Sequence, residues 1–107
     1  MKSSQLQKYR LNFSKVVDQF DFKKVRKIMK KLDWKWGAYN DARVPKVEEM
    51  QETCWDLLNS VLDNLEEIPA GSASTGGFEV YLENSGNLGI KFVLESAEYE
   101  VETGEAY

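Results

Sequence analysis

The sequence contains no histidine and only one cysteine, Cys54, among its 107 residues. Histidine is the commonest general base and metal ligand near neutral pH, so its absence removes the usual form of both kinds of site. A single cysteine can form neither an internal disulfide nor a Cys/His zinc site, and it is typical of a protein from a reducing cytoplasm. We therefore predict a non-enzymatic protein without a metal or another cofactor.

Long apolar runs are also absent. No stretch approaches the ~18 consecutive apolar residues of a transmembrane helix, and the N-terminal sequence MKSSQLQKYR lacks the apolar region of a secretory signal. A chain of 107 residues suits a single domain with one hydrophobic core. We expect one domain over 1–107, with an N-terminal amphipathic helix at 1–20, a core at 21–96 and an acidic tail at 97–107.

The two signs of charge are unevenly distributed along the chain. The formal net charge is −4. Residues 1–31 contain ten Lys and Arg and two acidic residues, which gives +8, whereas residues 32–107 contain four and sixteen, which gives −12. This division predicts a basic surface and an acidic surface on the same molecule.

Apolar residues recur every three or four positions in three segments, which is the pattern of amphipathic helices. The first helix ends near Phe20, and the second runs from Asp21 as its N-cap to Leu32 as its last core position. The third follows Pro45 and is expected to continue to Pro69. The sequence AGSASTGG that comes next is rich in turn-forming residues, so we expect a flexible connection there.

From Phe78 onward the apolar period changes from 3.6 to 2, which predicts two antiparallel strands joined by a turn at 84–87. The sequence EYEVE at 98–102 also alternates and is either a third short strand or part of the acidic tail. The predicted fold class is α+β in the order α-α-α-β-β, with two to three helices packed on one face of a small antiparallel hairpin or sheet. The predicted core contains Phe13, Val17, Val25, Met29, Cys54, Leu57, Leu58, Val61, Phe78, Val80, Ile90 and Phe92.

Basic side chains crowd the outer positions of the second predicted helix. Such a cluster either keeps the helix face solvated or binds a phosphate backbone. The candidate binding residues of this basic face are Lys23, Lys24, Lys27, Lys30 and Lys31.

The third predicted helix carries an uninterrupted row of carboxylates. Like charges four residues apart cost about 0.2–0.5 kcal/mol per pair, and acids near a helix C-terminus also oppose the helix dipole. Either lysines such as Lys23 and Lys24 compensate this end of the helix, or the row serves to bind a partner. The candidate residues of this acidic face are Glu48, Glu52, Asp56, Asp63, Glu67, Glu79 and Glu83.

Two tryptophans, Trp34 and Trp36, follow the basic helix with one residue between them. They are either a plug that seals the core or an exposed aromatic platform for a ligand. We favour the plug, because so small a domain has few apolar side chains as large as these.

Four short sequences, DWKWG, VPKVEEM, STGGFEV and LGIKFVLE, together give a layout that resembles a group of small uncharacterised bacteriophage and prophage proteins. The pattern runs from a tryptophan-containing turn through Pro-x-x-Glu-Glu to a Thr-Gly-Gly-Phe strand, and it covers residues 20–96. The resemblance implies an α+β fold and an origin in a mobile element, and hence location in the cytoplasm of a bacterial host. It implies no catalytic mechanism.

These observations favour an anti-defence protein that resembles anti-CRISPR inhibitors and uses its acidic face to bind a host protein or nucleoprotein complex that itself binds nucleic acid. One alternative is a small nucleic-acid-binding module that uses the basic second helix. Another is a structural or assembly accessory of a phage. The oligomeric state stays open, and we expect no membrane partner.

Overall fold

The computed structural model of the chain describes residues 3–37, 42–65 and 67–102. Three helices come first, α1 (Ser3–Gln19), α2 (Phe22–Lys31) and α3 (Val47–Asp63). Four strands follow, and their bounds are β1 (Gly71–Thr75), β2 (Phe78–Leu82), β3 (Leu88–Leu94) and β4 (Ala97–Glu102). The protein therefore has an α+β fold with its helices before its strands, as the sequence predicts.

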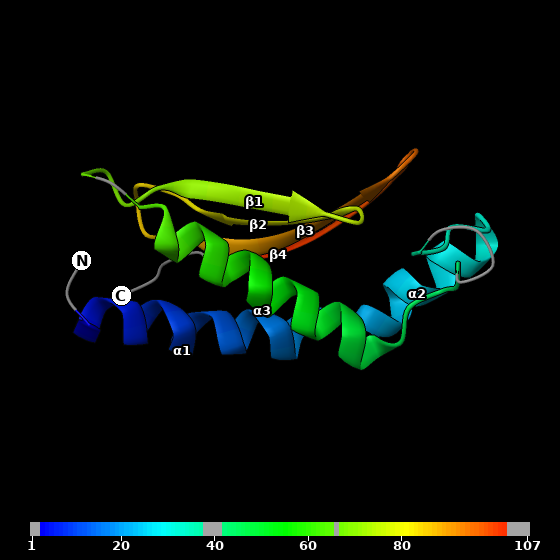
Figure 1. Cartoon of the computed structure of the whole chain (residues 1–107), viewed down its shortest axis with the longest axis horizontal. Coiled ribbons are helices and arrows are strands. Elements are labelled where there is room, and N and C mark those ends of the chain that lie inside the picture. The colour runs from blue at the N-terminus through cyan, green and yellow to red at the C-terminus, as the bar shows by residue number, and fades with distance from the viewer. Residues whose placement is uncertain (1–2, 38–41, 66, 103–107) are drawn as a thin grey trace.

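The four strands form one antiparallel sheet in the order β1-β2-β3-β4. The predicted hairpin of β2 and β3 is confirmed, with Phe78 opposite Phe92 and Val80 opposite Ile90. Figure 1 shows α1 and α3 side by side against the same face of this sheet, with α2 at one end of the molecule. The result is a two-layer molecule of 44 × 24 × 22 Å, and no helix among the described residues covers the other face of the sheet.

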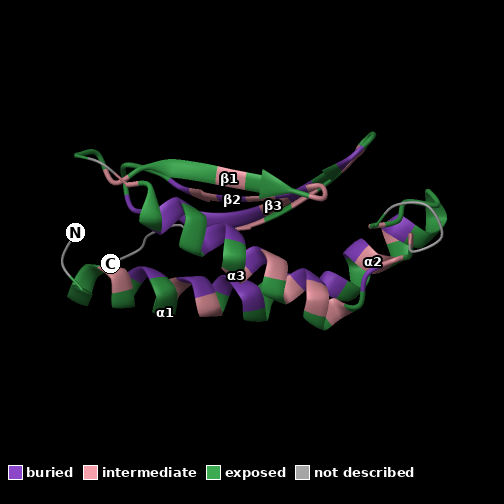
Figure 2. Cartoon of the chain, in the orientation of Figure 1, coloured by how far each residue is buried: buried purple, intermediate pink, exposed green. Residues whose placement is uncertain are grey.

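The core lies between the sheet and the two long helices. Figure 2 shows buried residues where α1 and α3 face the strands. All twelve residues predicted for the core are buried. The prediction succeeds because the buried positions follow the helical and strand periods of the sequence.

The expected flexible connection at 70–77 is partly wrong, because Gly71–Thr75 forms the edge strand β1. Its register with β2 places Ala73 opposite Val80. Gly76 and Gly77 form the two-residue turn between these strands, with φ of 58° and 90°. Positive φ at both positions is what a tight hairpin turn requires, and glycine adopts it with little strain.

Two helix ends also differ from the prediction. Leu32 is the C-cap of α2 and is exposed, so it is not a core position. Helix α3 ends at Asp63, with Asn64 as its C-cap, instead of continuing to Pro69. Ile68, which the periodicity places on the buried face, is 61% exposed. Asn64 ends the helix because its side-chain amide donates to the Ser60 carbonyl, 2.7 Å away.

The segment 98–102 belongs to strand β4, which pairs along its whole length with β3. The expected acidic tail therefore does not begin at 97, and its last part, 103–107, lies outside the described residues.

Candidate functional site

Helix α2 turns its few apolar side chains inward and its basic side chains outward. Its N-cap is Asp21, as predicted, whose carboxylate accepts from the Lys24 amide at 3.0 Å. Phe22, Val25 and Met29 are buried. The five lysines of the predicted basic face all occupy exposed positions, Lys23, Lys24, Lys27, Lys30 and Lys31.

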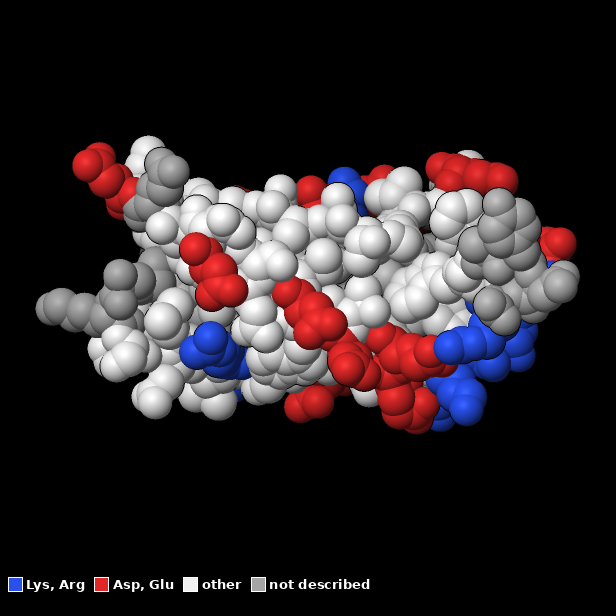
Figure 3. Space-filling view, in the orientation of Figure 1, with Lys and Arg blue, Asp and Glu red and all other residues white. Residues whose placement is uncertain are grey.

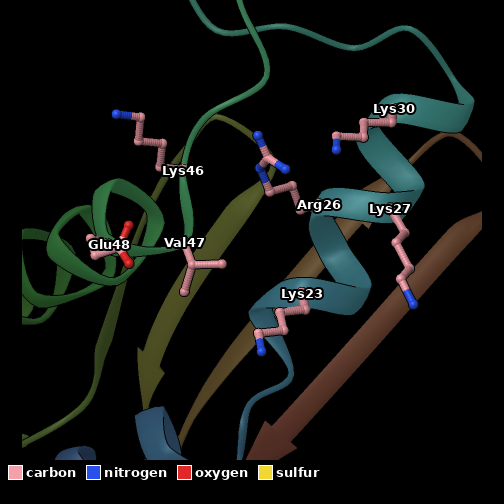
Figure 4. A pocket seen from close by; sticks show the side chains of 7 residues that line it. All are labelled: Lys23, Arg26, Lys27, Lys30, Lys46, Val47 and Glu48. Atoms are coloured by element: carbon pink, nitrogen blue, oxygen red, sulfur yellow. The ribbon is translucent and has the colours of Figure 1, made fainter.

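A groove of about 440 Å³ runs between α2 and the start of α3. Figure 4 shows Lys23, Arg26, Lys27 and Lys30 coming from α2, with Lys46, Val47 and Glu48 on the opposite side. Arg26 joins the two sides, because its Nε donates to the Pro45 carbonyl at 3.0 Å. That bond uses one of the five N–H donors of the guanidinium. This groove is defined below as the α2–α3 groove.

A second groove, of about 430 Å³, lies on the other flank of α2 and is lined by Lys24, Lys27 and Lys31 together with Asp21 and Ile28. Lys24 is anchored there, since its Nζ lies 4.5 Å from the centre of the Tyr99 ring. Tyr99 also accepts from the Asp21 amide at 3.1 Å and so ties the start of α2 to the sheet. Both flanks of α2 are thus basic.

Acidic side chains do not neutralise these lysines by direct contact. Within residues 3–37, 42–65 and 67–102, the ion pairs join Asp33 to Lys35, Arg43 to Glu49 and Lys91 to Glu98. None of them includes a lysine of α2. The positive charge of this helix is therefore available to an external anion.

Glu48, Glu52 and Asp56 follow one another along the exposed side of α3. In Figure 3, red atoms run along α3 and meet the blue atoms over α2 at one end of the molecule. That end is the N-terminus of α3, because Glu48 lines the same groove as Lys23. The expectation that Lys23 and Lys24 compensate the C-terminal end of α3 is therefore wrong.

The structure does not bring Glu67, Glu79 and Glu83 into this row. Asp63, the last residue of α3, comes seven residues after Asp56 and so ends the row on the same side of the helix, whereas Glu67 lies beyond the end of the helix. Glu79 alternates with the buried Phe78 and Val80, which places it on the uncovered face of the sheet.

Glu83 also lies apart from the α3 row, just after the end of β2. It accepts from the side-chain amide of Asn87 at 3.3 Å, and the same amide donates to Glu102 at 2.8 Å. The hydroxyl of Tyr81 donates to Glu102 at 2.7 Å, which lowers the pKa of that carboxyl. This network has a structural role on the outer face of the sheet.

Trp34 and Trp36 have different environments. The Trp36 indole N–H donates to the Gly76 carbonyl at 3.2 Å, and its ring meets Phe78 edge-on at 6.1 Å between centroids. Trp36 thus packs over the turn between β1 and β2, the position expected for a plug. Trp34 is 39% exposed, so the plug interpretation is wrong for this residue.

Sequence reasoning missed two parts of this region. Lys46 lines the α2–α3 groove together with Lys30, although it comes sixteen residues later in the chain. Thr53 of α3 and Thr75 of β1 line a groove with the two tryptophans. No sequence pattern predicts either groove, because each brings together residues that are far apart in the chain.

No group of three or more potential metal ligands occurs among the described residues. None of the described helices combines the length and the apolar character that crossing a membrane requires. No protein-family model matches the sequence, and neither a curated protein nor a solved structure is significantly similar to the chain.

Proposed function

We propose that this protein binds nucleic acid, and that α2 contacts the phosphate backbone. The observation that carries the proposal is the set of five exposed lysines on α2, which line two adjoining grooves and form no ion pair within the described residues. Lysine is a compact, flexible cation that suits phosphate contacts of this kind. Binding of this type is strongly salt-dependent, because each contact releases condensed counterions.

Arg26 and Lys46 add to the basic surface formed by the five lysines of α2. The bond from Arg26 to the Pro45 carbonyl holds its guanidinium at the edge of the α2–α3 groove. Lys46 lines the groove just before the start of α3, with its ammonium directed away from Arg26 (Figure 4). A phosphate in this groove would meet basic side chains from the α2 wall, whereas Glu48 would repel it from the α3 side.

The proposal is tested by replacing Lys27 and Lys30 with glutamate. Fluorescence anisotropy with labelled DNA and RNA should show salt-sensitive binding by the wild-type protein and a loss of at least about tenfold in affinity in the double variant. Arg10→Glu with Lys15→Glu is the matched control, because both residues are exposed on α1 and the double variant carries the same change of charge. A wild-type protein that binds none of these probes at low salt contradicts the proposal.

A second candidate function rests on the exposed carboxylates Glu48, Glu52 and Asp56, which also form no ion pair in the described part of the chain. A phage protein with this row would act against host defence by occupying the nucleic-acid-binding surface of a host complex. Charge complementarity would speed the encounter and make it sensitive to salt.

Replacing Glu52, Asp56 and Asp63 with lysine distinguishes this function from the first. Under the second function, the triple variant no longer captures a partner from a bacterial lysate at moderate salt, although the wild type does. Under the first function, the same variant binds nucleic acid at least as tightly as the wild type.

A further inference from the structure

Trp34 and Trp36 line a groove of about 460 Å³ that the basic face does not account for. Lys35 lies between them in the sequence and also lines the groove. The remaining wall includes Thr53 of α3 with Thr75 and Gly76 of the turn between β1 and β2. An exposed indole, a second indole beside it and two hydroxyls thus meet in one place.

The backbone holds Trp34 firmly although its side chain is exposed. The Trp34 amide donates to the Met29 carbonyl at 2.8 Å, and the Asp33 amide donates to the Lys30 carbonyl at 3.3 Å. These two bonds form a Schellman motif, which closes α2 and fixes the direction in which the chain leaves it. Two residues later, Trp36 exchanges backbone hydrogen bonds with Arg43 at 2.7 and 2.8 Å. The tryptophan is therefore presented by a segment fixed at both ends.

The tryptophan groove lies just past the C-terminal end of α2, since Trp34 comes three residues after Lys31. Lys30 and Lys31 line the two basic grooves, and Lys35 lines the tryptophan groove, where its ammonium lies 3.3 Å from the exposed carboxylate of Asp33. A nucleic-acid strand whose phosphates lie along α2 would therefore reach Trp34 next. A flat, exposed ring beside a run of cations is the arrangement that binds single-stranded nucleic acid, since a free base can stack on the ring while its phosphates meet the cations.

We infer that the preferred ligand is a single-stranded nucleic acid, and that Trp34 stacks on one of its bases in the groove. This inference rests on the proposed function, because the lysines of α2 supply the phosphate contacts. Duplex DNA does not offer this contact, since its bases are already stacked within the helix. Thr53 and Thr75 have hydroxyls that donate and accept hydrogen bonds, which suits the edge of any base.

The test compares Trp34→Ala with the wild-type protein. Labelled oligothymidylate and oligouridylate of about 15 nucleotides serve as single strands, and a DNA duplex of equal length serves as the comparison. We expect the wild type to prefer the single strands, and Trp34→Ala to lose about tenfold or more in affinity for them while its affinity for the duplex is unchanged. Comparing the DNA probe with the RNA probe shows which of the two kinds of single strand the protein prefers.

Two further variants act as controls. Trp34→Phe keeps an aromatic ring and should recover most of the lost affinity for single strands. Leu11→Ala removes another exposed apolar side chain, 62% exposed on α1, and should leave binding unchanged. Thermal melting of Trp34→Ala close to that of the wild type establishes that the variant is folded.

The possible failures are distinguishable. If Trp34→Ala binds single strands like the wild type while Lys27→Glu with Lys30→Glu does not, stacking is wrong and the phosphate contacts stand. If the wild type prefers the duplex, the inference is wrong even when the lysine variants weaken binding. If the wild type binds no probe, both the proposed function and this inference are wrong.

Discussion

Cys54 lies in the middle of the apolar side of α3 and has no exposed surface. Burial disfavours the charged thiolate and raises the pKa of the thiol to about 12. The thiolate is the reactive form, so the native protein should react with a thiol reagent such as Ellman's reagent only very slowly near pH 8. Absorbance should show one reactive thiol after addition of guanidinium chloride. Fast reaction of the native protein would contradict the buried position.

Glu49 makes the stability of the folded protein depend on pH through its hydrogen bonds at the start of α3. Its carboxylate accepts two hydrogen bonds from the Arg43 guanidinium and one from the Lys46 amide, and these bonds lower its pKa to about 2. A lowered pKa in the folded state means that the stabilisation is present above the unfolded value of about 4.5 and is lost as the pH falls toward 2.

We expect Glu49→Gln to reduce stability near neutral pH and to weaken its dependence on pH between about 4.5 and 2. Urea midpoints measured across this range provide the test. Glu48→Gln is the matched control, because Glu48 is also in the first turn of α3 but has no hydrogen bond to Arg43 among the described residues. Equal pH profiles for Glu49→Gln and the wild type would show that the pair contributes nothing.

The two neighbouring tryptophans provide a direct comparison of burial with exposure. Trp36→Ala removes a ring packed on Phe78 and Gly76, so we expect a loss of about 3 kcal/mol in the free energy of unfolding. Trp34→Ala, two residues away, should change that free energy by less than about 1 kcal/mol. Urea unfolding of both variants checks the difference. Similar losses for the two would mean that both rings seal the core.

Gly76 lies beneath the Trp36 ring and leaves no room for a side chain. A Cβ atom placed there would come within 2.7 Å of the Trp36 indole nitrogen, and the residue has a φ of 58°. Glycine is therefore required both by the turn and by the ring that lies over it.

The C-terminus of α2 depends on a residue in a costly conformation. Asp33 has a φ of 53°, in the left-handed region that the Schellman motif requires at this position. Glycine usually occupies it, since a side chain costs energy there. We expect Asp33→Gly to raise the free energy of unfolding by about 0.5–1 kcal/mol.

Asp33→Ala is the control for this prediction. It removes the same carboxylate and its exposed ion pair with Lys35, but it keeps a Cβ atom in the left-handed region. The alanine variant should therefore be less stable than the glycine variant in urea unfolding. If both variants are equally stable, the conformation of Asp33 carries no cost.

The helices and the central hairpin could be predicted because their apolar residues repeat with the period of the element they form. Strand β1 could not, since Ser72, Ala73 and Ser74 show no alternation between large apolar and polar side chains. It becomes a strand by pairing with β2, which is a tertiary interaction. The end of α3 could not be predicted either, because Ile68 continues the helical spacing whereas Asn64 ends the helix locally.

At the scale of the whole molecule, the basic face could be predicted and the grooves beside it could not. Lys27 and Lys30 must face outward because the opposite side of α2 holds its apolar residues. The α2–α3 groove depends on how α2 packs beside the start of α3, where Arg26 donates to the carbonyl of Pro45. Glu79 lies apart from the row on α3 because it points to the face of the sheet opposite the helices. The order of the acids along the chain does not reveal this.

The two charged surfaces meet at one end of the molecule. The acidic row begins at Glu48, which shares a groove with Lys23 and Lys46. A polyanion on α2 is therefore attracted by the lysines and repelled along α3, so charge alone disfavours a path along the α3 row. We expect a bound strand to follow α2 toward Trp34 for this reason.

The order of the elements has a consequence for synthesis on the ribosome. All three helices precede all four strands, yet the apolar sides of α1 and α3 are covered by strands β1–β4. During translation these helices emerge before the strands that cover them, and exposed apolar surface favours aggregation. The core residues Ile90 and Phe92 of β3 come late in the chain. We therefore expect nascent chains released before β3 to aggregate or to need a chaperone, because the core cannot close until β3 has left the ribosome.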